Sequence, residues 1–187
     1  MLRLSVIEHE RYAALNALSR LKTELSTDVL RNAFKQASGD FKLEVAARLL
    51  ARNDISGLPK VTAALLAPNG VPASVIADMS GSLTGIKDSR AVPALSSLVG
   101  SPNQLTRIGA VIALRQTASL AALEPLSRAL ADSNREVRYN AVAGMGEITR
   151  QDEWTPSIEE FNERETRYLS YWRNWAGWPR QPSTSPK

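Results

Sequence analysis

The sequence has no cysteine and only one histidine in 187 residues. Without cysteine there is no disulfide framework and no thiolate metal site, although this absence does not fix the compartment. With His9 alone, the chain can assemble neither a Ser-His-Asp triad nor a site with several histidine ligands. We therefore expect no metal and no cofactor, and we predict that the protein is not an enzyme.

Long hydrophobic runs are also missing. No apolar run in the chain approaches the roughly 18 residues that a membrane span needs. The start, MLRLSVIEHERY, becomes polar too early for a signal peptide. We expect a soluble protein and slightly favour the cytoplasm, while a signal peptide removed from upstream stays open as an alternative.

Charge of one sign is not concentrated anywhere in the chain. Residues 1–87 carry 11 basic and 8 acidic side chains, and residues 88–187 carry 12 and 11, for a net charge of +4. Modules that bind nucleic acid usually gather Lys and Arg on one face with aromatic residues between them. Here the two signs alternate, so we predict an ordinary solvated surface and do not expect nucleic acid as a partner.

The clearest feature of the sequence is a pattern of residues that occurs twice between residues 88 and 149. The copy DSRAVPALSSLVGSPNQLTRIGAVIALRQTA is followed by the copy SLAALEPLSRALADSNREVRYNAVAGMGEIT. Matching Pro93 with Pro125 and Arg107 with Arg138 gives an offset of 32 residues in the first half and 31 in the second, with the change placed in the turn. A self-similar unit of this length indicates stacked repeats.

Each copy is predicted to form a helix, a turn and a second helix. Pro93 and Pro125 stand in the first turn of their helices, where a missing N–H removes no intrahelical hydrogen bond. The polar turns offer side-chain caps for the second helices. Those second helices place small residues such as Gly109 and Gly144 beside larger apolar ones, which lets two helices approach closely.

These motifs resemble a known repeat family. AVPAL and LEPL, each followed by a polar turn and then by TRxxAVxAL or VRxxAVxGMG, are similar to the short HEAT-like repeats of bacterial proteins, the type named after phycobilisome (PBS) lyases. The resemblance implies an all-α, right-handed α-solenoid of about four helical hairpins with an aromatic C-terminal capping helix. It also implies that the second helices line the concave face and that the repeats serve mainly for binding.

We predict a single solenoid over residues 1–178 and a disordered tail over residues 179–187. Its parts are a leading helix at 9–22, repeats at 26–53, 56–84, 88–117 and 119–149, and a cap at 154–178. The second helix of the repeat at 56–84 departs from the pattern, because Ser74 stands near the position of Arg107 and Asp78 near a usual alanine. That helix is either a degenerate one or one that turns a carboxylate toward the concave face.

Two arginines occupy the same place in successive repeats. Arg107 and Arg138 both open second helices, so we predict a structural ladder between repeats. Asp132, just before Arg138, is the expected ion-pair partner and helix cap. A role in binding a ligand is the alternative for these arginines.

All four tryptophans lie between residues 154 and 178. A terminal repeat has no neighbour to cover its apolar face. We therefore predict that Trp154, Tyr168, Trp172 and Trp175 belong to a cap. The alternative is that an exposed aromatic cluster forms a partner site, because Trp, Tyr and Arg are favoured as binding anchors.

We predict a non-catalytic, monomeric scaffold or adaptor that binds a protein partner of unknown identity on the concave face. The polar residues expected on that face are Glu44, Arg48, Asp78, Gln104, Arg115, Glu136 and Arg138. The alternative is a small enzyme on the same scaffold, similar to bilin lyases or to HEAT-like DNA glycosylases. Its candidate residues are Asp78 and Glu44 with Arg48 and Arg52. A continuous basic groove favours the enzyme, and a groove of mixed charge favours the scaffold.

Overall fold

The computed structural model describes residues 2–21 and 23–177, and within these ranges the chain is helical with no strand. The predicted tail at 179–187 and Trp178 lie outside the described residues. Short 3₁₀ turns precede the first helices of three pairs, and no helix in the described ranges is long and apolar enough to cross a membrane. The helices are α1 Leu2–Arg20, α2 Glu24–Gln36, α3 Gly39–Leu50, α4 Leu58–Leu66, α5 Ala73–Ser82, α6 Val92–Leu98, α7 Gln104–Gln116, α8 Leu123–Ala129, α9 Arg135–Thr149 and α10 Ile158–Gly177.

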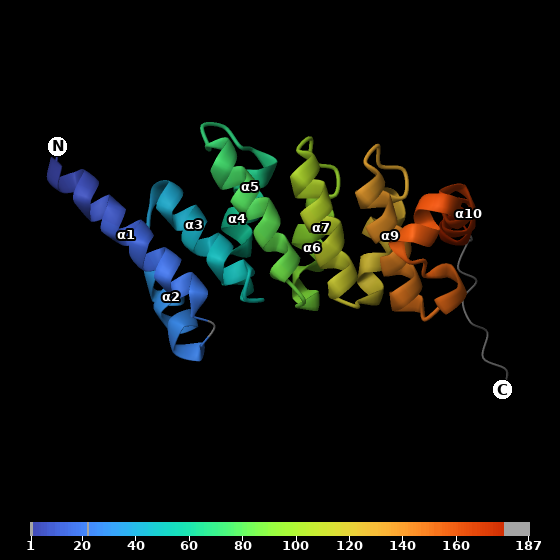
Figure 1. Cartoon of the computed structure of the whole chain (residues 1–187), viewed down its shortest axis with the longest axis horizontal. Helices are drawn as coiled ribbons and strands as arrows, with labels where there is room; N and C mark the ends of the chain where they lie inside the picture. Colours follow the sequence, from blue (N-terminus) through green and yellow to red (C-terminus); the bar gives the residue numbers. More distant parts are fainter. Residues whose placement is uncertain (1, 22, 178–187) are drawn as a thin grey trace.

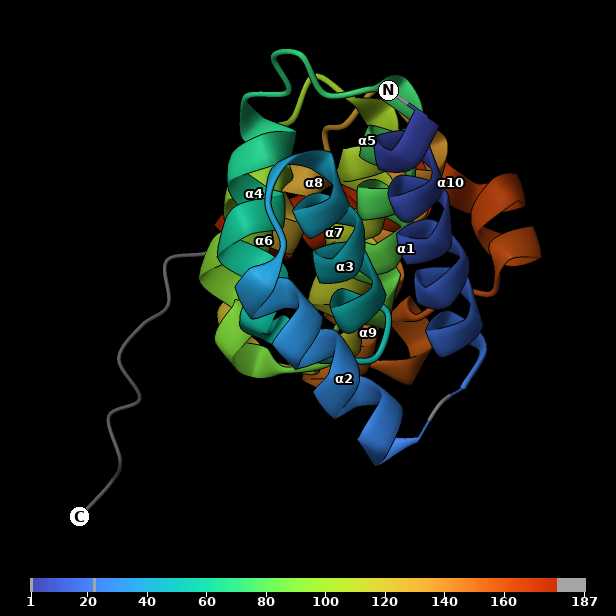
Figure 2. The ribbon, with the colours of Figure 1, turned by 90° about the vertical axis from the view of Figure 1, so that its left-hand side faces the viewer.

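The helices stack in pairs along one axis, which confirms the predicted all-α solenoid (Figure 1). The second helices of the pairs contact one another in order, α3 with α5, α5 with α7 and α7 with α9. The first helices, including α4 and α6, form the other layer (Figure 2). Neighbouring pairs therefore touch through their second helices, α4 and α6 also touch in the other layer, and an apolar core lies between the two layers.

The core is continuous from the first helical pair to the last helix. Buried side chains from every pair belong to one cluster, which reaches from Leu43 in α3 to Trp172 in α10. Leu83, Leu98 and Leu114 within it are fully buried. Because each pair buries its apolar surface on its neighbours, we expect the stack to unfold as one coupled unit.

Small residues set the spacing between the second helices. A Cβ atom added at Gly109 in α7 would lie 2.2 Å from the carbonyl oxygen of Ser80 in α5. One added at Gly144 in α9 would lie 3.0 Å from the Cβ of Arg115 in α7. The backbones of these helices approach one another too closely to admit a larger side chain at Gly109.

The predicted change of offset between the two copies is wrong. The second helices begin after the caps Asn103 and Asn134, whose side chains each accept a hydrogen bond from the backbone N–H three residues on. The first helices begin at Val92 and Leu123. Both pairs of positions differ by 31 residues, so the two hairpins share one period without an inserted residue.

The two prolines do not occupy equivalent positions in their helices. Pro93 is the second residue of α6, whereas Pro125 is the third residue of α8. The residue in α8 that corresponds to Pro93 is Glu124. Both prolines still fall within the first turn, where the N–H has no intrahelical partner, so the sequence rule accepts either position. In the same register Ile76, rather than Ser74, corresponds to Arg107.

Two N-terminal boundaries also differ from the prediction. Helix α1 begins at Leu2 rather than at residue 9, and α2 begins at Glu24, before the predicted repeat boundary at residue 26. The reason for the early start of α2 is a capping box. The Thr23 side chain accepts a hydrogen bond from the Ser26 N–H, and the Ser26 hydroxyl accepts one from the Thr23 N–H.

Helix α1 runs in the same direction as the second helices and packs beside α2 and α3 (Figure 1). Its buried Leu15 joins a small cluster with Leu30, Val45 and Leu49. The guanidinium of Arg52 donates to the carbonyl oxygens at the end of α1, at 2.7 Å for Leu21. Burial lowers the pKa of Arg52. The carbonyl oxygens accept hydrogen bonds from its guanidinium, so Arg52 links the end of α1 to the rest of the stack.

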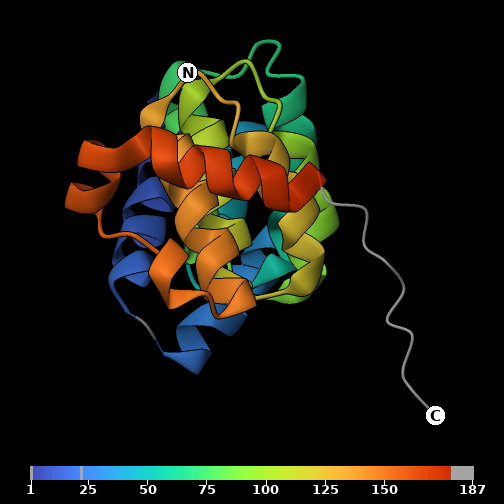
Figure 3. The ribbon, with the colours of Figure 1, turned by 90° about the vertical axis from the view of Figure 1, so that its right-hand side faces the viewer.

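Helix α10 lies across the other end of the stack, in contact with α8 and α9 (Figure 3). The helix has a kink at Arg164, where the backbone is not helical. Beyond the kink, Tyr168, Leu169 and Trp172 are buried in the main core. The Arg173 guanidinium donates to the Leu130 carbonyl oxygen at 2.9 Å, which ties α10 to the end of α8.

The close contact between α5 and α7 gives a stability prediction. Gly109→Ala should lower the free energy of unfolding by at least about 2 kcal/mol, because the new methyl group would overlap a backbone oxygen that cannot swing aside. Gly81→Ala is the matched control, since Gly81 is in α5 and has no atom within 4 Å of its added Cβ. The control should raise stability by about 0.5 to 1 kcal/mol. Urea denaturation of both variants measures the difference, and equal stabilities would contradict the close packing.

Candidate functional site

The candidate site is the surface of the second helices that faces away from the first helices. In α7, Leu105, Ile108, Ile112 and Arg115 recur every three or four residues and are exposed or half-buried. The opposite side of α7, with residues such as Leu114, is fully buried. We call the corresponding exposed surface of α3, α5, α7 and α9 the second-helix face. Figures 2 and 3 show α1 and the beginning of α10 on this side of the stack, at its two ends.

At the α3 end of the face, a small group of charges bridges two helices. An Arg48 guanidinium nitrogen lies 3.9 Å from an Asp78 carboxylate oxygen, so this ion pair links α3 to α5. Burial raises the pKa of Glu44, the charge of Arg48 opposes that shift, and the nearby Asp78 adds to it. The structure thus brings Glu44, Arg48 and Asp78 together, as residues facing the same surface.

At the α9 end of the face, Arg115 forms a second bridge. Its guanidinium donates to the two carboxylate oxygens of Glu147 at 2.8 and 2.5 Å and to the Asn140 side-chain oxygen at 3.2 Å. It also lies over the Tyr139 ring, 5.8 Å from the centroid. The hydrogen bonds that Arg115 donates to Glu147 raise the pKa of Arg115. Arg115 therefore joins α7 to α9 while one quarter of its side chain stays exposed.

Between these charged groups, the face is apolar. Leu105 is 51% exposed, and Ile108 and Ile112 are half-buried on the same side of α7. Ile112 belongs to neither of the buried core clusters formed by the described residues. The second-helix face therefore has an apolar centre on α7, with ion pairs of mixed sign on either side.

The two predicted ladder arginines, Arg107 and Arg138, each link their own turn to the next helical unit. Arg107 donates to both carboxylate oxygens of Asp132, at 2.7 and 3.1 Å, and to the Ser101 carbonyl oxygen of its own turn. Arg138 pairs with Glu165 of α10 at 2.6 Å and donates to the carbonyl oxygens of its own turn. Each arginine thus contacts its own turn and a carboxylate of the following unit.

One prediction about this ladder is wrong. The Asp132 carboxylate pairs with Arg107 of the preceding hairpin, and the cap of α9 is Asn134 rather than Asp132. Arg138 reaches only the Asp132 backbone carbonyl oxygen, at 2.8 Å. Both arginine side chains extend toward the next unit in the stack, which explains why the sequence neighbour is not the ion-pair partner.

The remaining predicted face residues are separate from these groups. Gln104 and Glu136 are exposed in the first turns of α7 and α9, and their side chains form no hydrogen bond or ion pair with the residues that the structure describes. Arg138 is directed to α10 instead.

Within the described ranges, no group of three or more His, Asp or Glu side chains is arranged to hold a metal ion.

The sequence reading missed Glu147 and Tyr139. Both lie on the exposed stripe of α9, eight residues apart, and Glu147 follows Arg115 by about one repeat period. That spacing is a usable signal, because residues one period apart occupy neighbouring helices in a solenoid. Leu105 and Ile112 carry no signal in the sequence that separates them from buried positions of a helix.

The cap aromatics mostly contact one another. Trp172 is fully buried, and its indole N–H donates to the Trp154 carbonyl oxygen at 3.1 Å. The Trp154 ring stacks on Tyr171 with centroids 3.7 Å apart. Tyr168 is buried, and Trp175 is half-buried beside Trp172. These rings therefore pack the end of the stack, with Trp154 and Trp175 partly open to solvent.

The geometry defines an α-solenoid of stacked helical hairpins that carries a surface of adjacent second helices. Residues 58–146, from α4 into α9, match the family described as HEAT repeats. This segment of the chain therefore consists of HEAT repeats. The match does not confirm the narrower name of the lyase-type repeat, and no curated protein matches the chain.

The ion pair between hairpins gives a pH prediction. Burial of Asp132 acts to raise its pKa, but the Arg107 side chain, the Asn134 N–H and the charge of Arg138 together outweigh burial, so the folded pKa is lowered. A lowered folded pKa stabilises the protein above the unfolded pKa of about 4, and this stability is lost as the pH falls through the folded value.

Asp132→Asn should therefore destabilise the protein by about 1.5 to 3 kcal/mol at neutral pH, because Arg107 loses its charged acceptor. The difference from the original protein should shrink as the pH falls below about 4. Thermal melts over a pH series measure this convergence. A difference that stays constant from neutral to acid pH would show that the ion pair does not carry the effect.

Proposed function

We propose that this protein is a non-catalytic scaffold that binds a protein partner through the second-helix face. HEAT repeats commonly serve as interaction scaffolds, since stacked helical pairs present a long continuous surface. The observation that carries the proposal is the apolar stripe on α7, where Leu105 in the first turn is 51% exposed and Ile108 and Ile112 are half-buried between the ion pairs on either side. Apolar residues ringed by polar ones are a common form of protein interface.

The charge of the face argues against the alternative of a nucleic-acid-processing enzyme. Arg48 faces Asp78, and Arg115 faces Glu147, so positive charge on the face is balanced within the protein. Arg52, a candidate for that enzyme, is occupied by the carbonyl oxygens of α1. DNA-binding grooves need unpaired Lys and Arg side chains that can meet phosphates. This face offers mixed charge instead, which favours a protein partner.

The side chains exposed on the second-helix face define the kind of partner that could bind there. A partner needs at least one apolar side chain to cover Leu105 and Ile112. Around that anchor, the exposed Gln104 and Glu136 and the partly exposed Arg115 can form hydrogen bonds or ion pairs with groups of either sign. Because Arg115 also links α7 to α9, its substitution would change folding as well as binding, and Leu105 is the better position to test.

Leu105→Glu should abolish capture of native partners without changing the melting temperature, because a charge in the apolar stripe of α7 opposes burial by the partner. Leu66→Glu is the matched control. Leu66 is 48% exposed at the end of α4, in the layer of first helices. The measurement is affinity capture from the source organism with the three proteins, followed by mass spectrometry.

Partners that the original protein and the Leu66→Glu variant retain, and that the Leu105→Glu variant loses, would support the proposal. Retention of every partner by the Leu105→Glu variant would remove the second-helix face as the binding surface.

A further inference from the structure

Helix α2 carries an apolar stripe whose first two residues, Leu25 and Val29, are largely open to solvent, whereas the third, Ala33, packs against the cluster of Leu15 and Leu30. Leu25 is 76% exposed, Val29 is 43% exposed, and the half-buried Ala33 continues the stripe one turn further. Residues four apart lie on the same side of a helix. α2 is the outermost first helix of the stack (Figure 1), so no further first helix lies beyond this stripe in the described chain.

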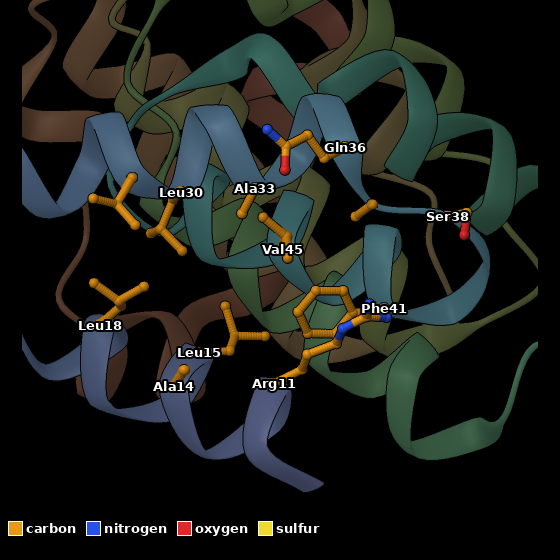
Figure 4. Close-up of a pocket in the computed structure, with 12 residues that line it drawn as sticks. Arg11, Ala14, Leu15, Leu18, Leu30, Ala33, Gln36, Ser38, Phe41 and Val45 are labelled. Atoms are coloured by element: carbon orange, nitrogen blue, oxygen red, sulfur yellow. The ribbon is translucent and has the colours of Figure 1, made fainter. Parts of the chain in front are cut away.

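The stripe borders a pocket between α1 and α2. The pocket has a volume of about 410 Å³, and its walls are mostly apolar (Figure 4). Ala14, Leu15 and Leu18 of α1 form one wall, Val29 and Ala33 of α2 form the other, and α3 closes the floor. A helix laid along α2 would cover the stripe and could place side chains in this pocket.

The charged residues of α2 form a second stripe beside the apolar one. Glu24, Asp28, Arg31 and Lys35 follow at intervals of four, three and four residues, which places them on one side of the helix. The two acidic residues are in the first half of α2 and the two basic residues in the second half. Arg31 already pairs with Asp28 and Asp54, whereas Lys35 is exposed and forms no ion pair with the described residues.

We propose that a second copy of this chain covers the stripe, with the two α2 helices antiparallel about a two-fold axis near Arg31. In that arrangement the acidic half of each helix lies beside the basic half of the other, and Asp28 comes close to Lys35 of the second copy. Leu25 lies opposite Ala37 of the second copy, and Val29 lies opposite Ala33, so large side chains meet small ones. In a parallel two-fold arrangement the two charged stripes would lie on opposite sides of the interface and could not pair.

The two-fold arrangement needs no other component, because one patch is complementary to itself. Helices α1 and α2 of both copies would then form a four-helix contact at the N-terminal ends of two solenoids. The second-helix faces of both copies would stay open, so this interface and the proposed binding function are independent of each other. This proposed interface is an alternative to the expected monomer.

Sedimentation velocity of the full chain from low to high micromolar concentration tests the proposal. The original chain should show a monomer–dimer equilibrium. Leu25→Glu should raise the dimer dissociation constant at least about tenfold. A matched control is Leu120→Glu, because Leu120 is 71% exposed, close to the 76% of Leu25, but lies at the start of the fourth hairpin. The control should dimerise like the original chain.

A charge exchange tests the antiparallel pairing itself. Asp28→Lys and Lys35→Glu should each raise the dissociation constant, because each places like charges together twice in a two-fold interface. The double variant restores opposite charges and should return to within about threefold of the original value. Circular dichroism checks that all variants stay folded. An original chain that is monomeric at every concentration, a Leu25→Glu variant that still dimerises, or a double variant without recovery would each overturn the proposal.

Discussion

The close contact between successive second helices is the constraint on which the other features depend. Gly109 lets α7 approach the α5 backbone at Ser80, and Ser80 also shares a buried hydrogen bond of 2.9 Å with Thr106 at the same crossing. Gly144 brings α9 against Arg115. With α7 and α9 side by side Arg115 can reach Glu147, and the contact between α3 and α5 likewise lets Arg48 reach Asp78. The same spacing produces both the continuous core and the surface proposed to bind a partner.

The hairpins at residues 88–149 were predictable because several local rules agree there. Prolines in first turns, polar turns with Asn103 and Asn134 as caps, and small residues in second helices all indicate the same fold. The register of the two copies was not predictable from the prolines, since Pro93 and Pro125 satisfy the same helix-start rule at different positions. The cap residues were the better guide to the period.

The candidate site was harder to predict than the fold. The sequence indicated Glu44, Arg48, Asp78 and Arg115, and the structure places them on the second-helix face in two groups. It did not indicate that Asp132 pairs with Arg107 and that Glu165 pairs with Arg138, because an arginine reaches the next helical unit rather than its own sequence neighbour. The exposed Leu105 was missed for a related reason. Which side of a helix stays open depends on where its neighbours lie.

The central claim is that tightly packed second helices couple the whole stack into one unit. Every tryptophan lies at or beyond residue 154, so indole fluorescence follows the C-terminal end, whereas far-ultraviolet circular dichroism follows all helices. Equilibrium denaturation monitored by both signals on the same samples tests the claim most directly. Coincident transitions with the same midpoint and slope are predicted. A fluorescence transition separated from the loss of helix would contradict the account, because the C-terminal end would then unfold independently of the rest.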